Sequence, residues 1–123
     1  MAWQFNPFTK KFDFFKDVLP RVYSTTSTSS LTPDVDSYDR IDITALAANI
    51  TINNHSGTPI NFQQLVIRIK DDGTTRTITW GSNYQSVGAT LPTITPAGKI
   101  IYVGLIYNSN VSIWDCVAVA TQS

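Results

Sequence analysis

Residues 65–80 read LVIRIKDDGTTRTITW, and this stretch decides the fold. The apolar side chains at 65, 67 and 69 share one face of an extended chain, whereas Arg68 and Lys70 lie on the other face. An Asp-Asp-Gly-Thr sequence at 71–74 is typical of a tight hairpin turn. Residues 75–80 then alternate again between threonines and larger side chains. The stretch therefore predicts two antiparallel strands joined by a hairpin.

Similar short alternating segments continue on both sides of this stretch. They cover residues 41–44, 50–53, 100–107 and 111–120, with turn residues such as Asn and Gly between them. All nine acidic residues are Asp and none is Glu, which suits turns and strands better than helix interiors. We therefore expect an all-β fold: a small antiparallel β-sandwich or jelly-roll-like domain over residues 38–123.

The last predicted hairpin is apolar on both faces. Residues 100–107 read IIYVGLIY, which leaves no polar face for solvent. Strands of this kind are covered on both sides, and a domain this small offers few elements for the second cover. The pattern predicts that a neighbouring subunit covers it, as in a homotrimer or a similar closed oligomer.

Aromatic residues are concentrated at the N-terminus. The first eighteen residues contain one of the three Trp and five of the six Phe. A segment this short cannot bury them by itself, so we expect residues 1–23 to be an anchoring arm that buries its aromatics on a partner. The arm is predicted to be mostly extended, with one short helix near 9–18 as an alternative for part of it. The predicted partner-binding residues are Trp3, Phe5, Phe8, Phe12, Phe14 and Phe15.

A Ser/Thr-rich segment separates the arm from the β domain. Residues 24–37 read STTSTSSLTPDVDS, with no hydrophobic period. The composition predicts a flexible tether.

Charge and length disfavour several classes of partner. Nine Lys and Arg balance nine Asp, whereas sequence-independent binding of nucleic acid needs a basic surplus. No apolar stretch approaches the ~20 residues that span a membrane, and the N-terminus lacks the pattern of a signal peptide. We expect no nucleic-acid partner and no membrane partner.

Candidate chemical groups do not form a recognisable constellation in the sequence. His55 is the only histidine and stands in a predicted turn, and Cys116 stands in a predicted strand as a small buried residue. Asp71 and Asp72 suit the turn before Gly73. The acids at 34, 36 and 39 lack the rest of a calcium-loop pattern. The sequence therefore predicts no catalytic residues, no metal site and no cofactor, and the protein is expected not to be an enzyme.

Five aromatic residues of the β domain have two open interpretations. Aromatic side chains on a β domain can stack on sugars, or they can fill the core or a subunit contact. The residues concerned are Trp80, Tyr84, Tyr102, Tyr107 and Trp114.

Two stretches resemble structural proteins of tailed-bacteriophage virions. The opening FNPFTKKFD (5–13) is similar to an Asn-Pro-Phe-Thr-Gly-x-Leu/Phe-Asp string near the start of phage fibre and appendage proteins, with Lys10 in place of the usual glycine. Residues 67–81, 91–93, 99–108 and 114–120 resemble a β domain of phage fibres and of head or tail appendages. The resemblance covers about half of the chain. It implies a virion component, commonly trimeric and attached through its N-terminus, and it carries no catalytic residues.

These observations lead to one expected function and two alternatives. We expect a bacteriophage virion structural protein, a trimeric capsid decoration (cement) or head-fibre protein. It would be made in the host cytoplasm and held on the particle surface by its contacts with the major capsid protein or with tail or portal components. The first alternative is a tail-fibre or tailspike-associated module that binds host surface glycans. The second is a small enzyme such as a wall hydrolase.

Overall fold

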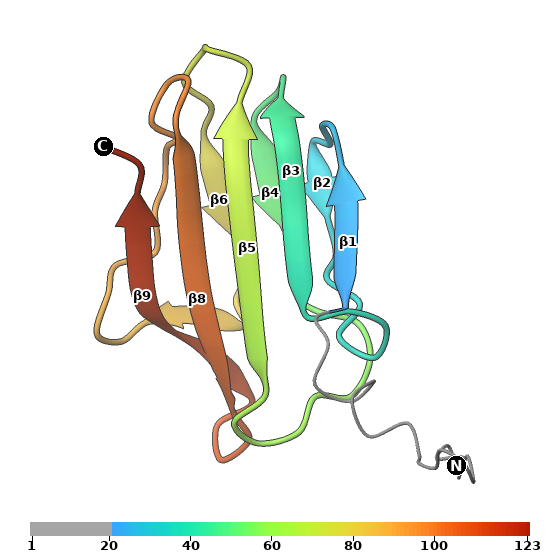
Figure 1. Ribbon diagram of the computed structural model, residues 1–123. Helices are drawn as coiled ribbons and strands as arrows, with labels where there is room; N and C mark the ends of the chain where they lie inside the picture. The colour runs from blue at the N-terminus through green and yellow to red at the C-terminus, as the bar shows by residue number, and fades with distance from the viewer. Residues whose placement is uncertain (1–20) are drawn as a thin grey trace, which may run out of the picture.

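The structure is a computed structural model that describes residues 21–123 (Figure 1). The six predicted anchor residues, from Trp3 to Phe15, lie outside the described residues. The extended conformation expected for residues 1–20 of the arm therefore stays a prediction, whereas Val22 and Tyr23, at the end of the predicted arm, belong to the first strand of the domain.

The described chain forms nine strands in two sheets and contains no helix. The large sheet has the order β1 (Val22–Thr25), β3 (Arg40–Leu46), β5 (Gln64–Asp71), β8 (Ile100–Asn108), β9 (Ile113–Thr121) and β7 (Tyr84–Ser86). The small sheet has the order β2 (Ser30–Leu31), β4 (Ile50–Ile52) and β6 (Ile78–Trp80), and lies behind the large one in Figure 1. The predicted all-β class is confirmed for residues 21–123.

The first six strands alternate between the two sheets. Each odd-numbered strand joins the large sheet and the next strand joins the small one, so the chain makes three successive coils. Like turns of a coil, the strands pair in parallel: Val22 lies opposite Arg40, which lies opposite Val66. In the small sheet β2, β4 and β6 are likewise parallel.

This arrangement corrects the prediction of an antiparallel domain. Only the β5–β8 and β8–β9 pairs are antiparallel, and β7 is parallel to β9. Since a jelly roll is built from antiparallel strands, the mixed pairing does not fit that topology. The β8–β9 hairpin was predicted correctly, because its two strands are adjacent in sequence and carry a turn between them.

The predicted hairpin at residues 71–74 is also wrong. β5 and β6 lie in different sheets, so these residues carry the chain from one sheet to the other. The buried Asp71 carboxylate fixes the crossing by accepting hydrogen bonds from the Gly73 N–H (2.9 Å), the Gly98 N–H (2.6 Å) and the Thr95 hydroxyl (2.6 Å). Gly73 has a φ of 103°, a conformation that side chains with a Cβ rarely adopt. The turn at residues 71–74 was therefore predicted correctly, but the pairing of β5 with β6 was not.

One hydrophobic core joins the two sheets. The large sheet contributes cross-strand rows such as Ile41, Ile67 and Val103, which are in register and almost fully buried. The small sheet contributes the buried side chains Leu31, Ile50, Ile52 and Ile78. At about 1.5–3 kcal/mol for each fully buried side chain, this cluster is the main stabilising term of the fold.

The segment predicted to be a flexible tether is part of both sheets. β1 ends at Thr25 and pairs with β3, and β2 pairs with β4 within residues 24–37. Leu31 and Val35 are buried in the core. Backbone pairing does not require hydrophobic side chains at every position, which is why a Ser/Thr-rich composition was misleading here.

Candidate interaction surface

The large sheet has one face away from the small sheet, here called the outer face. Alternation along the strands points every second side chain toward this face. Two cross-strand rows run across it: Val22, Arg40, Val66, Gly104 and Ala118 form the first, and Asp42, Arg68, Tyr102 and Ala120 form the second. The rows combine apolar groups with a few charged ones.

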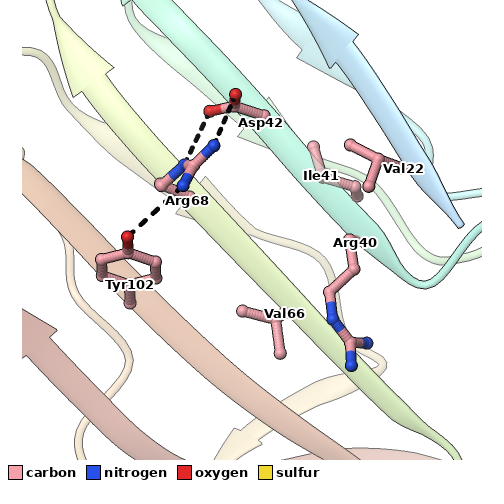
Figure 2. A pocket seen from close by; sticks show the side chains of 7 residues that line it. All are labelled: Val22, Arg40, Ile41, Asp42, Val66, Arg68 and Tyr102. Carbon is pink, nitrogen blue, oxygen red and sulfur yellow. Dashed lines mark hydrogen bonds and ion pairs between the residues drawn. The ribbon is translucent and has the colours of Figure 1, made fainter. Parts of the chain in front are cut away.

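An ion pair lies in the middle of this face (Figure 2). The Arg68 guanidinium donates two hydrogen bonds to Asp42, from Nε to Oδ1 (3.0 Å) and from Nη2 to Oδ2 (2.8 Å). Arg68 Nη1 lies 3.4 Å from the Tyr102 hydroxyl, and the guanidinium carbon lies 5.8 Å from the centre of the Tyr102 ring. β3, β5 and β8 thus supply one side chain each.

The Asp42–Arg68 ion pair determines the charge states in this cluster. The hydrogen bond from Arg68 is the main cause that lowers the pKa of the Asp42 carboxyl, and the bond to Asp42 is the main cause that raises the pKa of Arg68. Both groups therefore stay ionised and largely neutralise each other. An exposed pair of this kind contributes about 0–1 kcal/mol to stability, so its stronger effect is to hold Tyr102 and Arg68 in place.

A shallow depression of about 240 Å³ lies beside the pair. Its floor and walls include the apolar side chains of Val22 and Val66, and Tyr102 and Arg68 close one side (Figure 2). Val22 is 57% exposed and Tyr102 is 43% exposed. The site offers apolar contact area next to a neutralised ion pair, which suits a packed contact better than chemistry on a substrate.

The outer face continues over β8 and β9. Val117, Ile106, Val66 and Gly104 line a second shallow depression there. Val117 points outward because a bulge interrupts the β8–β9 pairing: Gly104 lies opposite Ala118, and Leu105 lies opposite Cys116. Strict alternation would place Ala118 on the core face with Trp114 and Cys116, but the bulge reverses the alternation after Cys116 and places Ala118 on the outer face.

The five aromatic residues that could either bind sugars or fill the core differ clearly in burial. Trp114 is fully buried, and Tyr84 and Tyr107 are 6% and 7% exposed, so these three are core residues. Trp80 is half-buried against the core, and its indole N–H donates to the Pro92 carbonyl. Only Tyr102 of the five presents its ring on an open face.

The contacts of His55 and the burial of Cys116 give both residues a role in stabilising the fold. His55 Nδ1 accepts a hydrogen bond of 3.0 Å from the Trp114 indole N–H, and its ring meets those of Trp114 and Tyr107 edge-on. Burial lowers the pKa of His55, although the charge of Asp36 acts in the opposite direction. Cys116 is fully buried, as predicted, and burial raises the pKa of its thiol.

The acidic residues near the start of the described chain take part in turns. Asp34 accepts from the Ser37 hydroxyl and the Asp36 N–H, Asp36 accepts from the Thr58 N–H, and Asp39 pairs with Arg21. Across residues 21–123, no group of three or more His, Cys or Asp side chains is placed to hold a metal ion. No helix able to cross a membrane occurs in the same residues.

The outer-face cluster was missed by sequence reasoning. Asp42 and Arg68 are separated by 26 residues and meet only because β3 and β5 are parallel neighbours. No local pattern in either strand signals that pairing. In comparisons with known proteins, no family model, curated protein or solved structure matches this chain.

Proposed function

We propose that this chain is a bacteriophage virion structural protein, a trimeric capsid decoration or head-fibre protein on the particle surface. The observation that carries the proposal is the concentration of one Trp and five Phe in the first eighteen residues, before a domain whose described residues form a hydrophobic core. A segment with this composition needs another surface to bury its side chains. The resemblance of FNPFTKKFD to the start of phage appendage proteins supports the same interpretation.

The arm would attach the protein to the particle, and the β domain would be the part exposed on the particle surface. Each fully buried Phe contributes roughly 1.5–3 kcal/mol, and three arms in a trimer act together through their high effective concentration. We propose that the two sheets are the halves of a β-sandwich and that the major capsid protein, or a tail or portal component, provides the docking surface. Assembly takes place in the host cytoplasm.

Removing residues 2–19 is expected to abolish incorporation into particles while the domain stays folded. The nine strands and the core found within residues 21–123 lie beyond the deletion, so the cooperative unfolding transition should remain. The measurement is the amount of chain that co-sediments with purified particles, for the full-length and the truncated protein. Equal co-sedimentation of the two proteins would contradict the docking role of the arm.

The outer face is the proposed seam between subunits. It carries the apolar groups Val66, Tyr102, Ile106 and Val117, and its central Asp42–Arg68 pair is already neutralised, so a second copy can cover this central part without isolating either of the two charges. This agrees with the expectation that a neighbouring subunit covers the apolar β8–β9 pair.

Replacing Val66 and Val117 together by Lys is expected to convert the trimer to a monomer. Two ammonium groups placed in an apolar contact lose their hydration without gaining partners. Light scattering at micromolar concentration measures the mass, and Thr51→Lys on the exposed side of the small sheet is the matched control. A monomer mass for the unmodified protein would refute the trimer.

Glycan binding by a tail-fibre or tailspike-associated module is the second candidate. The observation in its favour is the exposed ring of Tyr102 beside Arg68 and Asp42 on an open sheet face. The burial of Trp114, Tyr84 and Tyr107 leaves fewer rings for stacking on sugars, so the virion structural role is preferred.

A further inference from the structure

Two loops that carry exposed apolar side chains lie together at one end of the molecule. Residues 60–63 precede β5 and residues 109–112 connect β8 to β9, and both are at the lower end in Figure 1. The Ser109 N–H donates to the Asn61 side chain (3.0 Å), which joins the two loops. We call the side chains of Ile60, Phe62 and Val111 the apolar tip.

The apolar tip is unusually exposed. Phe62 is 75% exposed and Ile60 is 70% exposed, the two highest values among the large hydrophobic residues of the described chain, and Val111 is 55% exposed. Neighbouring residues on the loops are Asn61, Ser109, Asn110 and Ser112, so the tip is apolar at its centre and uncharged at its edge.

The backbone of the two loops is strained and is fixed by hydrogen bonds, which keeps these side chains exposed. Phe62 (φ 69°) and Ser112 (φ 57°) are the two residues other than glycine with positive φ in the part of the chain that the structure describes. The Phe62 N–H donates to the Tyr107 carbonyl (2.8 Å), and the Tyr107 N–H donates to the Gln63 carbonyl (2.8 Å). Residues kept in this backbone region cluster at binding sites, and a rigid loop loses little entropy when it binds.

The described chain begins at the same end. β1, β3 and β5 are parallel, so Arg21 lies at the end where β5 starts. Arg21 and Ile60 also line one depression, together with Asp36 and Asp39. The aromatic-rich segment 1–20 is therefore covalently joined to the rest of the chain next to the apolar tip.

We propose that the apolar tip is a second contact with the protein surface that the N-terminal arm binds, by insertion of Phe62 and Ile60 into an apolar cavity of that surface. The inference rests on the proposed function and extends it from the arm to the folded domain. A protein surface fits better than an anionic membrane, because the tip has no cation on its loops and the depression beside Ile60 has two carboxylates, Asp36 and Asp39, against one cation, Arg21.

The variant that tests the inference is Phe62→Gly in the full-length chain. Glycine accepts a φ of 69° without strain, so the substitution removes the side chain while the fold is retained or stabilised. Ile94→Thr is the matched control: Ile94 is 59% exposed but lies beside Thr95, which hydrogen-bonds Asp71 at the opposite end of β5. Affinity for purified particles assembled without this chain is measured by co-sedimentation.

The expected result is that F62G weakens binding to these particles by about tenfold or more, with I94T unchanged. An unchanged affinity for F62G, with binding lost on deletion of residues 2–19, overturns the inference and leaves the arm's role intact. Failure of the full-length chain to bind overturns both. An equal loss for F62G and I94T, a changed oligomer mass for F62G, or F62G-sensitive binding to vesicles of phosphatidylcholine and phosphatidylglycerol would also overturn it.

Discussion

Replacing Trp114 by alanine is expected to lower the free energy of unfolding by about 3–5 kcal/mol, the range for removing a large buried aromatic side chain. The indole is fully buried and packs against Tyr107 with ring centres 5.0 Å apart. Its N–H also satisfies His55 Nδ1 at 3.0 Å. The substitution therefore leaves a cavity and also an imidazole nitrogen without its donor.

Trp114→Phe separates these two contributions. Phenylalanine retains most of the ring packing but has no N–H, so it is expected to cost clearly less than alanine while still losing the bond to His55, a loss of about 1 kcal/mol. Urea unfolding followed by circular dichroism measures both variants. Val87→Ala at a 48% exposed position is the control and should stay within about 0.5 kcal/mol of the unmodified protein. A similarly small effect of W114A would contradict the placement of this ring in the core.

Replacing Asp71 by asparagine is expected to lower stability at pH 7 by about 1.5–3 kcal/mol, the usual contribution of hydrogen bonds to a charged group. The carboxylate is 2% exposed and accepts from Thr95, Gly98 and Gly73. Burial by itself raises the pKa of Asp71. The three hydrogen bonds and the charge of Arg76 outweigh burial, so that the pKa lies below its ordinary value.

The lowered pKa gives this prediction a pH signature. A carboxyl with a lower pKa in the folded state adds stability above its unfolded pKa of about 3.9, and that stability disappears as the pH falls through the folded value. The difference between the unmodified protein and D71N should therefore shrink below about pH 4. Unfolding curves between pH 7 and pH 2 test this, with the exposed Asp72→Asn as the control that has the smaller effect. A difference that is independent of pH would argue against a buried, ionised Asp71.

Local patterns in the sequence predicted the longer strands well, but they missed β1 and β2 and predicted the strand partners poorly. Alternation at 65, 67 and 69 predicted β5 and its buried face, and the apolar run at 100–107 predicted β8. The hairpin between β8 and β9 followed from adjacency in the chain. Parallel pairs such as β3–β5 join residues 26 positions apart, and no repeat in the sequence marks the successive coils.

For the candidate surfaces too, features set within one strand could be predicted from the sequence, and features set by contacts between distant segments could not. Burial of Cys116 could be predicted from its strand, whereas the outward position of Val117 depends on a bulge opposite Gly104 and Leu105. The exposure of Phe62 had no sequence signal, because a lone Phe in a polar loop is more often buried. Its conformation is imposed by bonds to Tyr107, a residue 45 positions later. Such features arise from tertiary contacts, which local composition does not encode.

The central position of β5 also determines when the protein can finish folding. One neighbour, β3, is synthesised before β5, but the other, β8, follows about thirty residues later, so one edge of β5 stays open during synthesis. An unpaired edge beside apolar side chains such as Ile67 invites pairing with other nascent chains. The C-terminal hairpin is thus the segment whose release from the ribosome closes this edge, and premature termination before residue 100 would leave an aggregation-prone product.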